Sequence, residues 1–244
     1  MKKQQWHTLI AKTHKWIGLI LGVQLLFWTI GGIVMTWIPL ETVRGEHKVS
    51  AESPAPIMAA TAYLPVADIV ARAVKSTVKA SYSLLLGDPV VTLVHTDGSK
   101  SMYSATSGDL LSPISAGMAE KVAVADFNID APVLAVALVN RPSVDYRGAL
   151  PVWQIKFDDA ENTALYISQA EGRVVARRSS IWRFYDFFWM LHIMDYEDRT
   201  DFNNWLIIAT SFFAALFAIS GFSLLFFRFY RRDFNFILGK KKRA

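Results

Sequence analysis

Two long stretches without a charged residue constrain the fold of this chain more than any other feature. Residues 16–40 read WIGLILGVQLLFWTIGGIVMTWIPL, and residues 202–227 read FNNWLIIATSFFAALFAISGFSLLFF. A helix that spans a bilayer needs about 20 consecutive apolar residues. Aromatic residues, which favour the headgroup region, stand near the ends of both stretches. We therefore predict two transmembrane helices, at residues 16–40 and 202–229.

The charged residues outside these stretches predict the orientation of the chain. The ends, 1–15 and 228–244, hold eleven Lys and Arg against one Asp, whereas residues 41–201 hold 15 Lys and Arg against 20 Asp and Glu. Because short basic segments are retained in the cytoplasm, we expect basic cytoplasmic tails at 1–15 and 230–244. In a bacterial inner membrane, the central region then lies in the periplasm. The net charge of +5 thus reflects contact with membrane lipids, and no nucleic acid partner is expected.

Several kinds of chemistry lack the residues that they need. The chain has no cysteine, which excludes disulfides, iron–sulfur clusters, thiolate-bound zinc and thioether-attached haem. Phosphate-binding glycine loops, dinucleotide fingerprints, Gly-x-Ser-x-Gly and His-Glu-x-x-His are also absent from the sequence. Whether the chain is an enzyme stays open.

The region between the two apolar stretches has a repeated order of elements. A linker at 41–63, rich in Pro, Ala and Ser towards its end, is followed by a helix that opens at Pro65 and by strands near 82–86, 90–94 and 100–111. A second helix near 116–127 precedes strands near 133–139, 153–157 and 165–167. Ser107-Gly108-Asp109 and Glu171-Gly172-Arg173 occupy equivalent places, 64 residues apart. We predict an α+β membrane protein whose extracytoplasmic domain holds two copies of one small unit, at 64–114 and 115–180.

These features resemble a known family. The repeated unit is similar to the PepSY domain, a helix on a small antiparallel sheet, and the whole chain resembles the PepSY-associated transmembrane proteins of bacterial inner membranes. His14-Lys15-Trp16-Ile17-Gly18-Leu19 is similar to the start of their first membrane helix, Thr29 with Gly31 to a later step in that helix, and Ser220-Gly221-Phe222 with Arg228–Arg232 to the end of a later one. Some members are ferric-siderophore reductases that carry b-type haem. Those members typically have four membrane helices, whereas two are predicted here.

The resemblance directs attention to the five histidines, because haem iron takes axial ligands such as His or Met. His14 shares one stripe of the first helix with Gly18, and His7 joins that stripe if the helix starts early. Glycines beside a histidine leave space for a flat macrocycle, so His14, His7 and Gly18 are candidate haem-binding residues. Gly18 and Gly22 equally form a Gly-x-x-x-Gly pattern that packs membrane helices together. An interfacial His14 that binds a lipid headgroup is a further alternative.

His192 is the second candidate haem ligand. It lies in a segment, 181–200, that begins IWRFYDFFWMLHIMDY, which is too short and too charged to span a bilayer. We predict an amphipathic helix on the outer membrane surface, with His192 on its aromatic face. In the family, a histidine between the PepSY part and the next membrane helix is a candidate ligand. The alternative is an aromatic belt in which His192 plays no part in binding.

The depths of these histidines restrict any haem site. A spanning helix of about 22 residues is about 33 Å long, so His14 at its inner end and His192 near the outer surface cannot share one iron. A second ligand must come from another protomer, from a partner, or from Met190 or Met194. We therefore expect a homo-oligomer or a complex with a membrane partner, which passes electrons to a ferric chelate or a periplasmic redox partner. The alternative is a haem-free accessory protein whose PepSY-like domain binds a periplasmic partner.

The remaining polar residues of interest have simpler expected roles. We expect His47 and His95 to lie at the surface. Gln24 and Thr29 are expected to bond to Ser211, Ser220 or a partner helix. The acidic residues between 195 and 201 are expected to be loop charges, with Asp201 or Asn203 as the N-cap of the second spanning helix.

Overall fold

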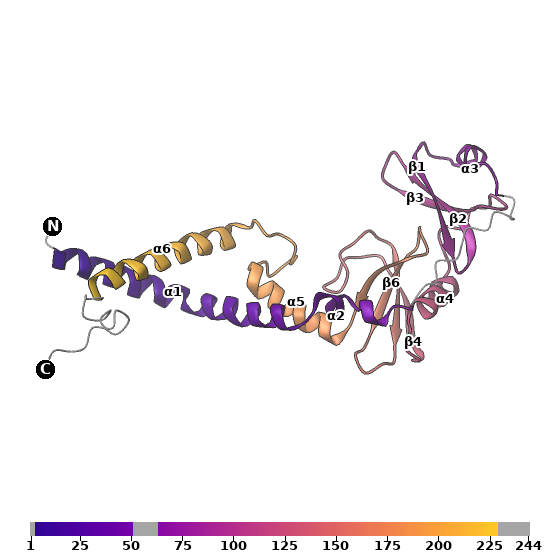
Figure 1. Ribbon diagram of the computed structural model, residues 1–244. Helices are drawn as coiled ribbons and strands as arrows, with labels where there is room; N and C mark the ends of the chain where they lie inside the picture. Colours follow the sequence, from indigo (N-terminus) through magenta and orange to yellow (C-terminus); the bar gives the residue numbers. More distant parts are fainter. Residues whose placement is uncertain (1–2, 51–62, 229–244) are drawn as a thin grey trace, which may run out of the picture. The chain divides into compact units, whose positions relative to one another are not determined.

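A computed structural model describes residues 3–50 and 63–228 (Figure 1). The predicted tail at 230–244 and most of the predicted linker lie outside these ranges. The chain divides into two compact units. We call residues 1–37 with 186–244 the helical unit, and residues 38–185 the α+β unit. Helix α5 (Ser180–Ile193) starts in the α+β unit and ends in the helical unit.

Two long apolar helices form most of the helical unit. Helix α1 covers Lys3–Trp37 and ends shortly before Pro39, and α6 covers Trp205–Arg228. Both are long and apolar enough to cross a membrane, as the sequence predicts. The N-cap of α6 is Asn204, so the expectation of Asp201 or Asn203 was wrong. Asn204 Oδ1 accepts from the N–H groups of Leu206 (3.1 Å) and Ile207 (3.0 Å).

Helices α5 and α6 each run antiparallel to α1, and they contact different lengths of it. Residue 14 of α1 meets residue 220 of α6, and Gly18 meets Phe217. Further along α1, Trp28 meets His192 and Gly31 meets Phe188 of α5. The last turns of α5 therefore line α1 as a third helix.

The α+β unit contains two antiparallel sheets, each preceded by a helix. After the short helices α2 (Leu40–Arg44) and η1 (Glu46–Lys48), helix α3 (Val66–Arg72) precedes β1 (Thr77–Leu85), β2 (Asp88–His95) and β3 (Lys100–Ser104). Helix α4 (Ala116–Asp126) precedes β4 (Val133–Val139), β5 (Val152–Phe157), β6 (Ala164–Ser168) and β7 (Val174–Arg178). Both sheets keep sequence order, β1-β2-β3 and β4-β5-β6-β7. The predicted α+β architecture is confirmed.

The two hairpin turns around the repeated glycines have the same hydrogen bonds. Gly108 N–H donates to Ser104 O (3.0 Å), and Gly172 N–H donates to Ser168 O (2.9 Å). Each of those serines donates its own N–H back to the residue after the glycine, at 2.9 Å in both turns. Both glycines have a positive φ, +74° and +65°, which a residue with a Cβ adopts at a cost. In the first turn, the predicted strand 100–111 is broken, and its end survives as one bridge, Tyr103–Leu110.

The largest core joins the two sheets. It combines Leu85, Val90 and Met102 from the first sheet with one face of α4 and with the inner faces of β5 and β6. Trp153 of β5 packs against this core and donates its Nε1–H to Ile114 O (2.9 Å). A smaller core around Ile69 joins α3 to the outer face of the first sheet.

Candidate functional site

His14 is held on α6 by its ring and by one of its nitrogens. The ring stacks on Phe217 with centroids 4.2 Å apart and planes 8° apart. Nδ1 lies 2.8 Å from Ser220 Oγ and 3.2 Å from Phe217 O. Ser220 Oγ also lies 2.8 Å from Phe217 O, which is an acceptor. The consistent arrangement is a chain in which Nδ1–H donates to Ser220 Oγ and Ser220 donates to Phe217 O.

This assignment of the hydrogens determines which nitrogen of His14 has a free lone pair. If Nδ1 carried the lone pair, it would face the lone pairs of Phe217 O at 3.2 Å. We therefore assign the proton to Nδ1 and the lone pair to Nε2. Within residues 3–50 and 63–228, Nε2 of His14 has no hydrogen bond.

Two glycines make this close approach of α1 and α6 possible. A Cβ on Gly18 would lie 2.6 Å from Phe217 Cε2, and a Cβ on Gly221 would lie 3.1 Å from His14 Cε1. Each glycine thus accepts an aromatic ring from the opposite helix. Gly22, by contrast, has no atom of the described residues within 4 Å of its Cβ position, so the Gly18-x-x-x-Gly22 pair does not act together in this contact. The space beside Gly18 holds the ring of Phe217.

His192 lies near the C-terminus of α5 and faces the C-terminal half of α1. Its ring is 6.2 Å from that of Trp28, and its Nδ1 is 3.8 Å from the Cβ position of Gly31. Nδ1 is buried and has no hydrogen-bond partner in the described part of the chain. His14 and Gly31 are separated by about 25 Å along α1 at 1.5 Å per residue. The two histidines therefore form two separate locations, as their sequence positions predict.

The C-terminus of α5 is capped by side chains from α1 and from the residue before α6. Gln24 Nε2 donates to Leu191 O (3.1 Å), Trp28 Nε1 to His192 O (2.8 Å) and Asn204 Nδ2 to Ile193 O (3.0 Å). The last carbonyls of a helix lack partners within the helix, so these three bonds fix where α5 ends. Gln24 thus bonds to a neighbouring helix, although not to the serines of α6 that were also expected. The expected bond of Thr29 to another helix was wrong, because Thr29 donates to Leu25 O of its own helix.

The acidic loop after α5 is organised around one carboxylate. Asp195 accepts four backbone N–H groups, from residues 197, 198, 200 and 201, at 2.9–3.3 Å. These bonds, with that from Asp201 contributing most, lower the pKa of Asp195. Arg199 pairs with Asp186 of α5, and Trp189 Nε1 donates to Arg199 O. The loop charges thus serve the loop itself, as predicted.

The other three histidines are His7 in the helical unit and His47 and His95 in the α+β unit. His7 is half-buried on α1, about 10 Å along the helix from His14. His47 is exposed in η1. The expectation of a surface position was wrong for His95, which is buried and has Nε2 at 2.7 Å from Ser101 Oγ. Over the described ranges, no three His, Asp or Glu residues are grouped so as to hold a metal ion.

The loop between β5 and β6, residues 158–163, anchors both ends of the α+β unit. Lys48 of η1 is buried, and its Nζ lies 3.1 Å from Asp159 Oδ2, 2.9 Å from Glu161 Oε2 and 3.0 Å from Thr163 Oγ1. Glu161 O accepts from both N–H (2.8 Å) and Oγ–H (2.7 Å) of Ser180, the first residue of α5. One short loop therefore fixes the segment that follows α1 and the start of α5.

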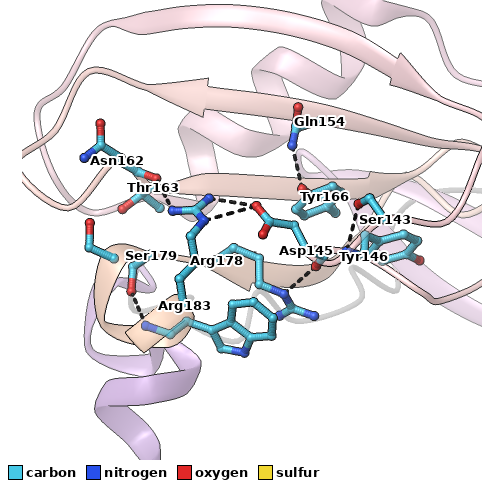
Figure 2. Close-up of polar contacts among 12 residues, drawn as sticks. Ser143, Asp145, Tyr146, Gln154, Asn162, Thr163, Tyr166, Arg178, Ser179 and Arg183 are labelled. Carbon is cyan, nitrogen blue, oxygen red and sulfur yellow. Dashed lines mark hydrogen bonds and ion pairs between the residues drawn. The ribbon is translucent and has the colours of Figure 1, made fainter. Parts of the chain in front are cut away.

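Figure 2 shows the polar cluster at the base of α5. Ser179 Oγ accepts from Trp182 N–H (3.2 Å) as an N-cap. Arg183 Nη2 donates to Asp145 Oδ2 (2.8 Å), and Arg178 Nε donates to Asp145 O (2.6 Å). The Arg178 guanidinium also lies 4.1 Å from the centre of the Trp182 ring. Because these groups partner one another, the cluster supports α5 structurally.

The comparison with known families agrees with this architecture. A family model described as the PepSY-associated TM region matches residues 11–244, which include most of α1, both sheets, α5 and α6. No curated protein and no solved structure matches the chain. The family match covers nearly the whole chain, with two apolar helices flanking an α+β unit as the motifs around His14 and Ser220 predict. The chain belongs to the family of the PepSY-associated TM region and is a membrane protein of the PepSY type.

Proposed function

We propose that this protein is a b-haem-binding, electron-transfer subunit of the bacterial inner membrane, which works in an oligomer or complex. In this proposal both termini are cytoplasmic, because they carry eleven of the 26 Lys and Arg residues and one acidic residue. The α+β unit is then periplasmic. The electron acceptor is a ferric chelate or a periplasmic redox partner.

The environment of His14 is the observation that carries this proposal. Histidines that bind a metal usually donate the other ring N–H to an oxygen, which fixes the tautomer and the ring orientation. His14 has this arrangement, with Nδ1–H directed at Ser220 Oγ and Phe217 O. Phe217 also restrains the ring by stacking on it. His14 therefore fits an axial haem ligand that binds through Nε2.

The other candidate residues fit a haem less completely. Gly18 is occupied by Phe217, so a macrocycle at His14 would extend away from this glycine. His7, about two turns away on α1, is a second candidate contact. His192 would have to bind through Nε2, which leaves its buried Nδ1 without the usual acceptor. Met194, two residues after His192, is buried, and Met190, two residues before it, is half-buried.

The roles of the residues follow from these positions. Bound b-haem supplies one-electron redox chemistry. His14 holds the ligating nitrogen, Ser220 keeps its tautomer, and the α1–α6 contact excludes water from Nδ1. Because His14 and His192 lie about 25 Å apart along α1, the two locations serve opposite halves of the membrane, and each needs a second ligand from another chain or from Met.

A reduced-minus-oxidised absorption spectrum of the full chain, expressed with haem in excess and purified in mild detergent, tests this proposal. We expect the α band of a b-type haem, its loss in His14→Ala, and no change in His47→Ala, which removes an exposed histidine. Ser220→Ala should lower haem affinity by about 10- to 100-fold. A colourless wild-type protein, or haem retained at full occupancy in His14→Ala, would contradict the proposal.

A second candidate function is a haem-free accessory protein, and the first sheet favours it. Strand β1 is an edge strand whose residues 78–84 are all exposed, including Val78 at 65% and Tyr82 at 41%. Such an edge can accept an extended segment of a periplasmic partner by strand addition. A stoichiometric membrane partner that co-purifies with colourless protein, and that is lost on Val78→Pro, would support this function over the first.

A further inference from the structure

Strand β4 leaves one edge of the second sheet open. It pairs with β5 on one side. On its other side, no strand of the described chain is paired with it. Leu134 and Leu138 are exposed at 67% and 41%, and the strand has no charged residue. An uncharged apolar edge strand invites pairing with another strand.

The sequence of β4 reads the same in both directions. Its seven residues are VLAVALV, centred on Val136, and their pattern of exposure has the same mirror order, with Val133, Val136 and Val139 half-buried and the four others exposed. In an antiparallel pair of two such strands centred on Val136, Val133 would face Val139, Leu134 would face Leu138, and Ala135 would face Ala137. An isologous interface needs this kind of self-complementary surface.

The charges that flank β4 follow the same symmetry. Asp130 precedes the strand and Arg141 follows it, and both are exposed. Neither forms an ion pair with another described residue. In a pair centred on Val136, Asp130 of one strand comes within one residue of the position opposite Arg141 of the other. Both residues lie beyond the paired strand itself, so each end of the pair would hold one acidic and one basic side chain in neighbouring positions.

We propose that β4 pairs antiparallel with β4 of a second copy of this chain, around a twofold axis at Val136. The pairing joins two four-stranded sheets into one sheet of eight strands and covers the β4 edge of each copy. The bulge between Val133 and Ala135 lies at one end of the strand, so the central residues keep a regular ladder. The interface is independent of haem, so it stands or falls separately from the function proposed above.

A second copy fits this edge better than an unrelated peptide does. Any extended peptide could satisfy the backbone groups of β4. The match of Leu134 with Leu138 across the pair, and the nearness of an acidic to a basic group at each end, arise when the partner has the same sequence in the opposite direction. The proposal therefore predicts a specific register as well as a dimer.

A single cysteine tests the register, since the chain has no cysteine of its own. On a twofold axis, the Cβ atoms of the two residues 136 would lie about 5 Å apart, which is close to disulfide geometry. We expect Val136→Cys in membrane vesicles to form a disulfide-linked dimer rapidly under mild oxidation. Val78→Cys is the matched control, a valine exposed on β1, an edge strand of the first sheet. A dimer yield at position 136 no greater than at position 78 would overturn the proposal.

Charge reversal tests the interface without altering the fold, because both residues are exposed. Asp130→Arg and Arg141→Asp should each weaken the dimer in detergent by about tenfold, because each variant places like charges near one another at both ends of the pair. The double variant D130R/R141D restores opposite charges and should regain wild-type dimerisation. A monomeric wild-type chain, single variants that dimerise normally, or a double variant no better than the single ones would refute this register. Dimers that survive all three changes would place the interface elsewhere.

Discussion

Replacing Lys48 with methionine should destabilise the α+β unit strongly. The Lys48 side chain is 5% exposed and faces two carboxylates and a hydroxyl, at Asp159, Glu161 and Thr163. Methionine has a similar length but no charge, so the Asp159 carboxylate, 6% exposed, would lose its cation. Breaking a buried pair by removing one partner costs about 3–5 kcal/mol. For a unit of this size, that corresponds to a fall in Tm of roughly 10 °C.

Thermal unfolding of the purified full chain in detergent measures this effect. The matched control is Lys75→Met, which removes the lysine of an exposed pair with Asp97 and should leave the Tm almost unchanged. Adding Asp159→Asn to Lys48→Met should recover part of the loss, because an amide can still bond to Thr163 without a buried charge. If Lys48→Met and Lys75→Met melted at the same temperature, the anchoring role of the β5–β6 loop would be refuted.

Three further predictions concern the helices and the effect of pH. Gly18→Leu should disrupt the α1–α6 contact and lower the Tm, because its Cβ would lie 2.6 Å from the Phe217 ring. Gly22→Leu is the control and should be tolerated, because the Cβ position of Gly22 has open space around it. Equal effects of the two variants on the Tm would contradict this packing. Gln24→Leu leaves Leu191 O without its donor, so the backbone amides in the last turn of α5 should exchange their hydrogens with solvent faster than in the control variant Thr29→Val. Equal exchange rates in the two variants would contradict this cap. Burial raises the pKa of Asp159, but hydrogen bonds from Thr163 and Lys48 outweigh burial, so the pKa is lowered from its usual value. The pKa of Glu171 is lowered in the same way, because bonds from Arg173 and Lys100 outweigh burial. A carboxyl group whose pKa is lowered in the folded state stabilises the fold at a pH above its unfolded pKa, near 4. This stabilisation is lost as the pH falls through the pKa of the folded state. The Tm should therefore stay level from pH 7 to 5 and fall below pH 4, less steeply in Lys48→Met; a Tm that did not fall below pH 4 would contradict this assignment.

The sequence was sufficient for the parts of the fold that depend on solvent preference and on turn geometry. The apolar lengths of residues 16–40 and 202–227 predict α1 and α6, and the glycines at 108 and 172 predict two equivalent hairpins. Those hairpins have matching hydrogen bonds, because a positive φ at one fixed place specifies the turn. The resemblance based on the residues around His14 and Ser220 is confirmed by the family match.

The sequence was insufficient where a contact depends on how helices align. The sequence predicts that His14 and Gly18 share one face of α1. It does not predict that the Phe217 ring contacts both of them, because that contact depends on the register of α1 against α6. Gln24 was recognised as a polar residue in an apolar helix, yet its partner is a backbone carbonyl of α5. Backbone carbonyls have no sequence signal. A helix end could have been suspected from Gln24 and Trp28 together, since both can donate and lie one turn apart.

The buried ion cluster was missed for a related reason. Lys48 and Asp159 are 111 residues apart in sequence, and charged residues are rarely buried. Sequence position alone therefore suggests a solvated linker lysine. The same bias made His95 look exposed, although Ser101 on the neighbouring strand bonds to its ring.

The placement of the chain across the membrane underlies every function proposed here, and cysteine labelling measures it directly. Val74 is fully exposed in the α+β unit, and Gln4 is exposed near the start of α1. In a chain without native cysteine, a membrane-impermeant maleimide applied to intact spheroplasts should label Val74→Cys at once. Gln4→Cys should be labelled after the membrane is permeabilised. Labelling of Gln4→Cys in intact spheroplasts, with Val74→Cys protected, would contradict the account.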